Sequence, residues 1–335
     1  MRFLVVGAGY WGPNIVRNLL ELPDVESVAV SDVDQVRAEK LAKRFPRTTV
    51  APQAPLAFAD RYDAVCIVTP VTTHAHLATD ALLAGSHVFI EKPMTRTSEE
   101  ARQLISLADR LDRRLMVGHV FHYKPCVRKL VQIAHSGQLG EIRYLDSVRA
   151  NLGVFRPDVN VMWDLAPHDL TIFEAIMGRS PKRVAATGAC HVRHPVTPQE
   201  TIVYLTLDYG DDCIGHVHVN WYSPMKSRLM MVAGDQKMAV YDDIHPTEPI
   251  RVYDHGTYEP EKDTPYYPTI RTGDISIPVI KENEEPLKVQ LREFIASIRE
   301  HRRPETDGNA GLRLIETLEA ATKSLKGDGG FVEVG

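Results

Sequence analysis

Residues 1–32 read MRFLVVGAGYWGPNIVRNLLELPDVESVAVSD, and this stretch decides the fold of the first part of the chain. An apolar, β-branched run leads directly into Gly7-Ala8-Gly9-Tyr10-Trp11-Gly12, which is a G-x-G-x-x-G pattern. In that pattern Gly7 permits a tight turn, Gly9 lets a pyrophosphate approach the backbone, and Gly12 lets the following helix pack closely. Pro13 suits the first turn of this helix, whose free N–H groups attract phosphate. The stretch therefore predicts a strand, a glycine-rich turn and a helix that together bind a dinucleotide.

A second apolar run, from Val25 to Val30, ends at Ser31-Asp32 and places a carboxylate twenty residues beyond Gly12. At that spacing an acidic side chain accepts hydrogen bonds from the adenosine ribose hydroxyls. Asp32 therefore predicts NAD, rather than NADP, as the cofactor. The alternative is an α/β turn without a ligand, in which Asp32 caps a helix.

The composition is that of an ordinary globular protein. A chain of 335 residues, 44% apolar and 25% charged, is long enough for two domains and a sizeable core. Its net charge of -5 provides no basic surface for nucleic acid. Its four cysteines are scattered and form no C-x-x-C pair, so neither a disulfide framework nor a metal site is expected. Without a leader-like segment or an apolar run that could span a bilayer, we expect a cytoplasmic protein with no membrane span.

Strands and helices alternate along residues 1–121, which we expect to form the first domain. Beyond Asp32, strands are expected at 62–68, 87–90 and 115–117, and helices at 35–45, 73–84 and 98–111, the last capped by Ser98. Such alternation predicts a doubly wound parallel sheet, which binds ligands beyond the carboxyl ends of its strands. The polar residues and turn residues expected at those ends are Thr69, Pro70, His74, Glu91, Lys92 and His119.

From Tyr123 the pattern changes, and we expect a second domain over 122–335. Long runs of alternating character, such as 201–207 and 215–221, predict a large, mostly antiparallel, open sheet. Helices are expected at 127–135, 286–301 and 310–325, and a long loop or extended arm at 245–279. The apolar run 229–232 fits a sheet face that a second subunit covers, so we expect a homodimer or homotetramer.

Glu91-Lys92-Pro93 follows a buried strand, at the edge of the sheet that the nicotinamide end of a bound NAD would reach. A lysine there can present its ammonium group to a substrate hydroxyl while hydride leaves the same carbon, or it can relay the proton. Lys92 is therefore a candidate catalytic residue. The alternative is a surface lysine that forms a salt bridge with Glu91.

A second group of candidates lies in Trp163-Asp164-Leu165-Ala166-Pro167-His168-Asp169, which precedes an apolar periodic run. We expect Asp164 to cap this helix, with Pro167 in its first turn, so that Asp164 and His168 share one face. Imidazole titrates near neutrality and can remove a hydroxyl proton, while a neighbouring carboxylate orients it or contacts a sugar. The alternative is a helix cap beside a surface histidine.

The glycine pattern, Glu91-Lys92-Pro93 and Asp164-x-x-x-His168 together resemble the glucose-fructose oxidoreductase, inositol dehydrogenase and rhizopine-catabolism (Gfo/Idh/MocA) family, over nearly the whole chain. The resemblance implies a Rossmann domain followed by an α/β domain with an open sheet. It also implies that Lys92, Asp164 and His168 are the catalytic set, with His168 as general acid/base. The side chains that it adds to the cofactor set are Tyr10, Trp11, Thr69, Pro70, His74, Glu91, Lys92, His119 and Trp163.

Within the family, the runs Gly9–Asn14, Trp163–Asp169 and Trp221–Pro224, with Lys226 and Arg228, are similar to the branch that oxidises the 3-hydroxyl of UDP-linked amino sugars. Arginine pairs with phosphate or carboxylate in a bidentate way, so Arg149 and Arg156 suit an anionic sugar. The predicted substrate set is Lys92, Arg149, Asn151, Arg156, Asp164 and His168. The alternative is that both arginines are merely exposed loop residues.

Two other functions compete with this prediction. One is a free-sugar or inositol dehydrogenase of the same family. The other is a regulatory protein that binds NAD without catalysis, which would need the glycine pattern but not Lys92, Asp164 and His168. We favour the enzyme because all three of these residues are present.

Overall fold

The computed structural model describes residues 1–153, 155–156, 159–192, 199–258, 269–280 and 284–335. The chain forms two compact units. The first unit contains Met1–Tyr123 and Glu284–Glu316, and the second contains Lys124–Asn283 and Thr317–Gly335. The sequence predicted a single boundary after residue 121, whereas in the structure the chain returns to the first unit at Glu284.

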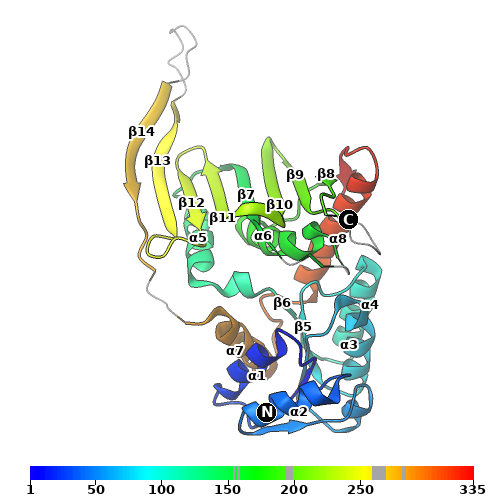
Figure 1. The fold of residues 1–335 in the computed structure, drawn as a ribbon. Helices are drawn as coiled ribbons and strands as arrows, with labels where there is room; N and C mark the ends of the chain where they lie inside the picture. The colour runs from blue at the N-terminus through cyan, green and yellow to red at the C-terminus, as the bar shows by residue number, and fades with distance from the viewer. Residues whose placement is uncertain (154, 157–158, 193–198, 259–268, 281–283) are drawn as a thin grey trace. The chain divides into compact units, whose positions relative to one another are not determined.

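The first unit is built on a six-stranded parallel sheet with the strand order β3-β2-β1-β4-β5-β6 (Figure 1). Its strands are β1 (Arg2–Val6), β2 (Ser27–Ser31), β3 (Thr48–Val50), β4 (Ala64–Ile67), β5 (His87–Glu91) and β6 (Leu115–Gly118). All five strand pairs of this sheet are parallel. The order runs outward in both directions from β1 and β4, which confirms the predicted doubly wound Rossmann sheet.

Helices connect these strands. They are α1 (Gly12–Leu20), α2 (Gln35–Arg44), α3 (His74–Leu83) and α4 (Ser98–Arg110), with short 3-10 turns at Leu56–Ala59, Val71–Thr73 and Val120–Tyr123. The cap of α4 differs from the prediction, because Thr97 rather than Ser98 precedes the helix. The Thr97 hydroxyl accepts a hydrogen bond of 3.2 Å from the backbone N–H of Glu100, and Ser98 is the first helical residue.

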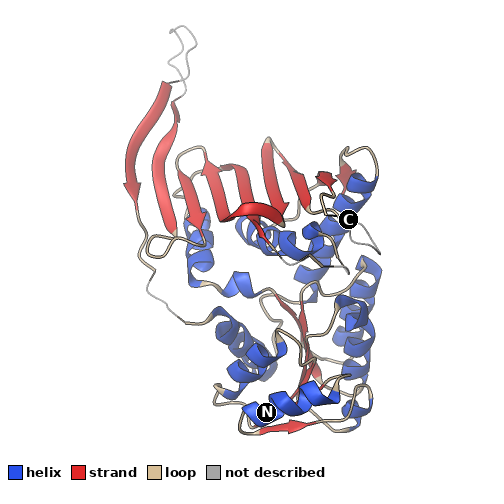
Figure 2. Ribbon diagram, in the orientation of Figure 1, coloured by secondary structure: helices blue, strands red, loops and turns tan. Residues whose placement is uncertain are grey.

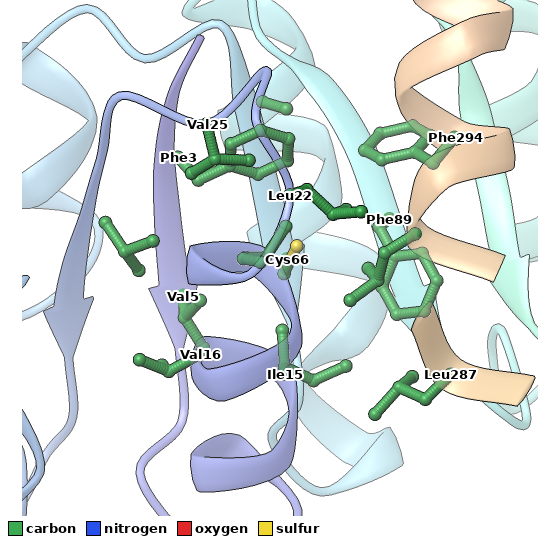
Figure 3. Packing of buried hydrophobic residues seen from close by; sticks show 14 of the residues in the cluster. Phe3, Val5, Ile15, Val16, Leu22, Val25, Cys66, Phe89, Leu287 and Phe294 are labelled. Carbon is green, nitrogen blue, oxygen red and sulfur yellow. The ribbon is translucent and has the colours of Figure 1, made fainter. Parts of the chain in front are cut away.

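The returning segment completes the core of the first unit. It consists of α7 (Pro286–Arg299) and the start of α8 (Gly308–Lys326), the two units being divided within α8. Figure 3 shows Phe294 of α7 beside Phe3 of β1 and Phe89 of β5, and their ring centroids lie 6.5 and 6.0 Å from that of Phe294. All three rings are fully buried. Burying a phenylalanine stabilises a fold by about 1.5 to 3 kcal/mol, so the apolar face of α7 binds it to this sheet.

The second unit contains a nine-stranded sheet with the order β14-β13-β12-β11-β7-β10-β9-β8-β15. Its strands are β7 (Ile142–Leu152), β8 (Arg183–Ala189), β9 (Ile202–Gly210), β10 (Cys213–Asn220), β11 (Tyr222–Gly234), β12 (Met238–Asp242), β13 (Ile250–Tyr258), β14 (Thr269–Ser276) and β15 (Val332–Glu333). Of the pairs between described residues, β7 with β10 is parallel and the others are antiparallel. The predicted large, mostly antiparallel, open sheet is therefore confirmed.

The sequence predicted a long loop or extended arm at 245–279, and the loop alternative is wrong for most of the described part, which is strand. Strands β13 and β14 pair with each other and extend the sheet beyond β12 (Figure 1). Ile250 and Val252 point inward and are buried. The many polar residues between and after them make the alternation of apolar and polar side chains hard to recognise in the sequence. Residues 259–268 lie outside the described part of the chain.

Helices cover one face of the nine-stranded sheet (Figure 2). They are α5 (Pro125–His135), which contacts β12, and α6 (Val161–Met177), which contacts β7, β9 and β10. The opposite face carries large side chains that are 38 to 48% exposed, namely Tyr144, Tyr204, Ile214 and Leu229. No helix in the described part of the chain is long and apolar enough to cross a membrane.

Candidate active site

The glycine turn between β1 and α1 is tightly packed on one side and open on the other. Gly7 has a φ of +111°, and a Cβ added to it would lie 2.7 Å from the carbonyl oxygen of Val68. A Cβ on Gly12 would lie 2.2 Å from the carbonyl oxygen of Gly7. A Cβ on Gly9 would meet nothing within 4 Å. The turn thus needs Gly7 and Gly12 for its own packing and leaves open space beside Gly9, which fits the approach of a pyrophosphate.

The Asp32 carboxylate is fixed beside this turn. Its Oδ2 accepts a hydrogen bond of 2.6 Å from the N–H of Ala8, and its Oδ1 accepts one of 2.7 Å from the N–H of Asp34. Asp34, and not Asp32, caps α2, so the alternative role of Asp32 as that cap is excluded. A carboxylate oxygen can accept more than one hydrogen bond, so Asp32 fits the ribose hydroxyls of NAD.

Glu91, at the carboxyl end of β5, links Trp11 of the glycine turn to the backbone of Lys92. The indole N–H of Trp11 donates to Glu91 Oε1 at 2.8 Å, and the backbone N–H of Lys92 donates to Glu91 Oε2 at 3.2 Å. Burial raises the pKa of Glu91 to about 7, although Lys92 and the Trp11 indole act in the opposite direction. Trp11, predicted to contact the cofactor, thus uses its indole N–H to hold Glu91.

Two histidines of the predicted cofactor set are buried. His74 is 1% exposed; its Nδ1 lies 3.0 Å from the carbonyl oxygen of Pro93, and its Nε2 lies 2.8 Å from that of Thr69. Both ring nitrogens face backbone carbonyl oxygens, which does not fit the predicted role of His74 as a direct cofactor contact. His119, which follows β6, is 3% exposed, and its burial lowers its pKa to about 3, with the charges of His122 and Lys92 acting in the same direction.

The remaining predicted cofactor residues of the first unit lie near the glycine turn or after β4. Tyr10 is 93% exposed and its ring stacks on that of Trp11, with centroids 6.5 Å apart. Thr69 Oγ1 accepts a hydrogen bond of 2.7 Å from Thr73 Oγ1, and Pro70 is exposed. Lys92 is partly buried at the end of β5 and precedes Pro93 through a cis peptide bond.

In the second unit, α6 begins earlier than predicted. Asn160 is its N-cap and accepts a hydrogen bond of 3.1 Å from the N–H of Trp163, so the prediction that Asp164 is the cap is wrong. Asp164 lies in the first turn and Pro167 lies inside the helix, where it removes one backbone hydrogen bond. The spacing of four residues still places Asp164 and His168 on one face of α6, and both are partly buried.

The Asp164 carboxylate has two polar neighbours from other segments. The indole N–H of Trp221, at the end of β10, donates to Asp164 Oδ2 at 3.2 Å, and Arg156 Nη1 lies 3.5 Å from Asp164 Oδ1. Trp221 is 2% exposed, so it fixes the carboxylate from the interior. The sequence predicts no site role for Trp221. The feature that could have indicated one is the position of this tryptophan at the end of an alternating run.

Three predicted substrate or cofactor residues of this unit, Arg149, Asn151 and Trp163, lie within its strands and helices. Arg149 is 4% exposed and makes two hydrogen bonds of 2.8 Å with Asp169, so it is removed from the set that reaches a substrate. Asn151 lies near the carboxyl end of β7. The indole N–H of Trp163, which was predicted to contact the cofactor, donates to Thr322 Oγ1 at 3.0 Å within the unit.

A further charged cluster lies around Asp243, which follows β12. Lys124 and the Tyr241 hydroxyl donate to Asp243 Oδ1, and Arg228 Nη1 donates to Asp243 Oδ2 at 3.2 Å. Burial raises the pKa of Asp243, but the hydrogen bonds from Lys124 and Tyr241 outweigh it and hold the pKa below its ordinary value. Of these four residues, only Tyr241 and Asp243 are close to each other in the sequence. No local pattern therefore predicted the cluster.

Among the described residues, no group of three or more His, Cys, Asp or Glu side chains could hold a metal ion. The polar groups of the site described above are hydrogen-bond donors, carboxylates and imidazoles. Lys92 belongs to the first unit, and Asp164 and His168 belong to the second.

Comparison with known proteins agrees with these features. Residues 1–119 match a model described as "Oxidoreductase family, NAD-binding Rossmann fold", and residues 127–240 match the GFO/IDH/MocA C-terminal domain. The UDP-N-acetylglucosamine 3-dehydrogenase of Acidithiobacillus ferrooxidans is 28% identical over 94% of each chain. A solved structure of that enzyme covers 97% of both chains with a TM-score of 0.78 at 26% identity. The inositol 2-dehydrogenase of Rhizobium meliloti is 24% identical over 97% of each chain.

The two family models together cover more than half of the chain, and they divide it where the sheet changes from parallel to mostly antiparallel. The glycine turn, the fixed Asp32 carboxylate and the open space at Gly9 fit the NAD that the first model names. The chain belongs to the Gfo/Idh/MocA family of NAD-binding oxidoreductases.

Proposed function

We propose that this protein is an NAD-dependent dehydrogenase that oxidises a hydroxyl of a sugar ring to a ketone, and that its substrate is the 3-hydroxyl of a UDP-linked amino sugar. The observation that carries the proposal is the face of α6 that presents Asp164 and His168, with Asp164 held by Trp221. Lys92, at the carboxyl end of β5, completes the set of side chains that such an oxidation needs.

Each of the three side chains has a distinct role in the proposal. NAD, when bound, accepts the hydride from the carbinol carbon. His168 takes the hydroxyl proton, because an imidazole can be a base near neutral pH. Lys92 presents its ammonium group to the oxygen on which negative charge develops. Asp164 orients the imidazole or the sugar, and the Trp221 indole keeps its carboxylate in place.

The UDP-linked substrate is supported by the relative named UDP-N-acetylglucosamine 3-dehydrogenase and by Arg156. The Arg156 guanidinium is exposed and lies beside the Asp164 carboxylate. Arg149 is buried against Asp169, so we assign the phosphate or uronic acid to Arg156, whose guanidinium is exposed beside the Asp164 carboxylate. We keep Arg156 in the proposed substrate set, together with Asn151 near the carboxyl end of β7.

The second candidate is an inositol or free-sugar dehydrogenase, which the relative named inositol 2-dehydrogenase favours. A neutral polyol would not need Arg156. Initial rates of NADH formation should be measured at 340 nm with UDP-N-acetylglucosamine, its uronic acid, free N-acetylglucosamine, glucose and myo-inositol. The proposal expects turnover of a UDP-sugar, with Arg156→Ala raising KM more than it lowers kcat. Equal or better turnover of the neutral compounds would instead favour the second candidate.

Variants of the catalytic set separate an enzyme from a regulatory protein that binds NAD. Lys92→Met and His168→Ala should each lower kcat by about 30-fold to 5,000-fold, which corresponds to roughly 2 to 5 kcal/mol, while the Kd for NAD stays within about threefold. Unchanged turnover in either variant would remove that residue from the set. A protein that binds NAD but oxidises none of the compounds would fit the regulatory alternative.

We also propose that two copies of the chain associate through the outer face of the nine-stranded sheet. Tyr144, Ile214 and Leu229 leave apolar surface exposed on adjacent strands of that face. Monomeric proteins rarely leave a large contiguous apolar patch in water, so a second copy of the same face is the occupant that we expect.

A further inference from the structure

Two loops of the first unit are joined by one buried side chain. His74, the first residue of α3, lies between the carbonyl oxygen of Thr69, which follows β4, and that of Pro93, which follows β5. The two contacts are 2.8 and 3.0 Å, and the ring is 1% exposed. A neutral imidazole donates to only one of the two carbonyls and an imidazolium donates to both. In either state the buried ring lies between the two loops and fills the space that separates them.

Pro93 follows Lys92 directly, so this link acts on the backbone that carries the proposed catalytic lysine. On the other side of Lys92, its N–H donates to Glu91, whose carboxylate is held by the Trp11 indole. The Lys92 backbone is thus held from both directions. On one side the contacts run from the glycine turn through Trp11 and Glu91. On the other side they run from the loop after β4 through His74.

We propose that His74 is a positioning residue that fixes the Lys92–Pro93 backbone for catalysis, although His74 itself does not touch the reacting atoms. The inference rests on the proposed function of Lys92. A catalytic group must stay close to its productive geometry, and a displacement of about 1 Å can lower a rate by about 100-fold. Because the ring is buried and both of its nitrogens face backbone, its removal should loosen this loop without removing a contact to NAD or to the sugar.

The structure supplies a matched control at the opposite ends of the same two strands. The Ser86 hydroxyl, just before β5, donates to the carbonyl oxygen of Tyr62, just before β4, at 2.8 Å and is 3% exposed. Ser86→Ala therefore removes one buried hydrogen bond of the same unit, far along the strands from Lys92. Its effect on stability should resemble that of a His74 variant, but its kcat should equal that of the wild type.

Two conservative variants separate the contacts of the ring. An asparagine amide reaches the place of Nδ1 and a glutamine amide the place of Nε2, so His74→Asn keeps a donor for Pro93, and His74→Gln keeps one for Thr69. We expect His74→Ala to lower kcat by about 10-fold to 100-fold, with KM for the sugar and Kd for NAD within about threefold. His74→Asn should recover more of the kcat than His74→Gln, because the Pro93 contact lies next to Lys92.

A readout that needs no activity tests the same idea. Hydrogen-deuterium exchange of the full chain, followed by mass spectrometry of peptides covering residues 90–96, should be at least about tenfold faster in His74→Ala than in the wild type. Ser86→Ala should leave that segment unchanged. If the wild type oxidises no sugar, the function of Lys92 fails, while the exchange measurement still decides whether His74 fixes this loop.

Three results would overturn the inference. The first is a kcat of His74→Ala that equals that of Ser86→Ala once both are normalised to folded protein. The second is a loss confined to the Kd for NAD, which would make His74 part of the cofactor site. The third is unchanged exchange of residues 90–96 in His74→Gln, which loses the contact with Pro93. This is the decisive measurement if His74→Ala does not fold.

Discussion

Replacing Arg149 with methionine should strongly destabilise the second unit. Arg149 of β7 donates from Nε and Nη2 to the two carboxylate oxygens of Asp169 on α6, each at 2.8 Å. The two residues are 4 and 2% exposed, so Arg149→Met leaves a buried carboxylate without its guanidinium. Removing one partner of such a pair costs about 3 to 5 kcal/mol, whereas methionine retains most of the apolar stem.

Urea unfolding of the full chain, followed by tryptophan fluorescence, measures this effect. Trp163 and Trp221, two of the three tryptophans, belong to the second unit, so the signal reports chiefly on it. With an m-value of about 2 to 3 kcal/mol per M, a loss of this size lowers the midpoint by at least about 1 M urea. The change should also lower kcat, because Asp169 follows His168 on α6.

Removing both charges tests whether the loss comes from an unpaired charge. Arg149→Met combined with Asp169→Leu should recover at least about 2 kcal/mol relative to Arg149→Met alone, since a buried ion pair can be replaced by apolar side chains of similar volume. Arg183→Met, which breaks an exposed cross-strand pair with Asp208, is the control and should leave the midpoint unchanged. A loss below about 1 kcal/mol in Arg149→Met, or a double variant as unstable as the sum of the single ones, would refute the reasoning.

Three further predictions follow from the site and from the sheet. Asp32→Ala should narrow the preference for NAD over NADP, measured as the ratio of their Kd values, and a wild type that prefers NADP would contradict the role of Asp32. Because burial raises the pKa of Glu91 from 4.5 to about 7, the folded protein retains a proton that the unfolded chain has released within this window. Stability should therefore fall by roughly 2 to 3 kcal/mol as the pH rises from 4.5 to 7, and Glu91→Gln should remove most of this fall in urea titrations at several pH values. Ile214→Asp, on the outer face of the sheet, should shift the protein toward a monomer in analytical ultracentrifugation, and an unchanged mass would remove that face as the interface.

Much of the first unit could be predicted from the sequence, because its signals are local. The glycine spacing of Gly7 to Gly12, and apolar runs ending at Asp32 and Lys92, follow from turn sterics and from the period of a buried strand. The spacing of Asp164 and His168 likewise predicts that they share one face of a helix, although the cap is Asn160 rather than the predicted Asp164. Patterns of this kind need only neighbours in the chain.

Other features depend on pairings between distant segments, which no local pattern contains. The apolar period of residues 286–299 predicted a helix, but the packing of Phe294 against Phe3 and Phe89 decides to which unit it belongs. Arg149 has the same side chain whether it faces a ligand or a buried carboxylate, and the register that places it beside Asp169 selects the second. His74 was predicted to line the cofactor, but the fold places it between two backbone carbonyls. Local spacing predicted the elements and the candidate residues, and long-range burial determines which of those residues remain free to act.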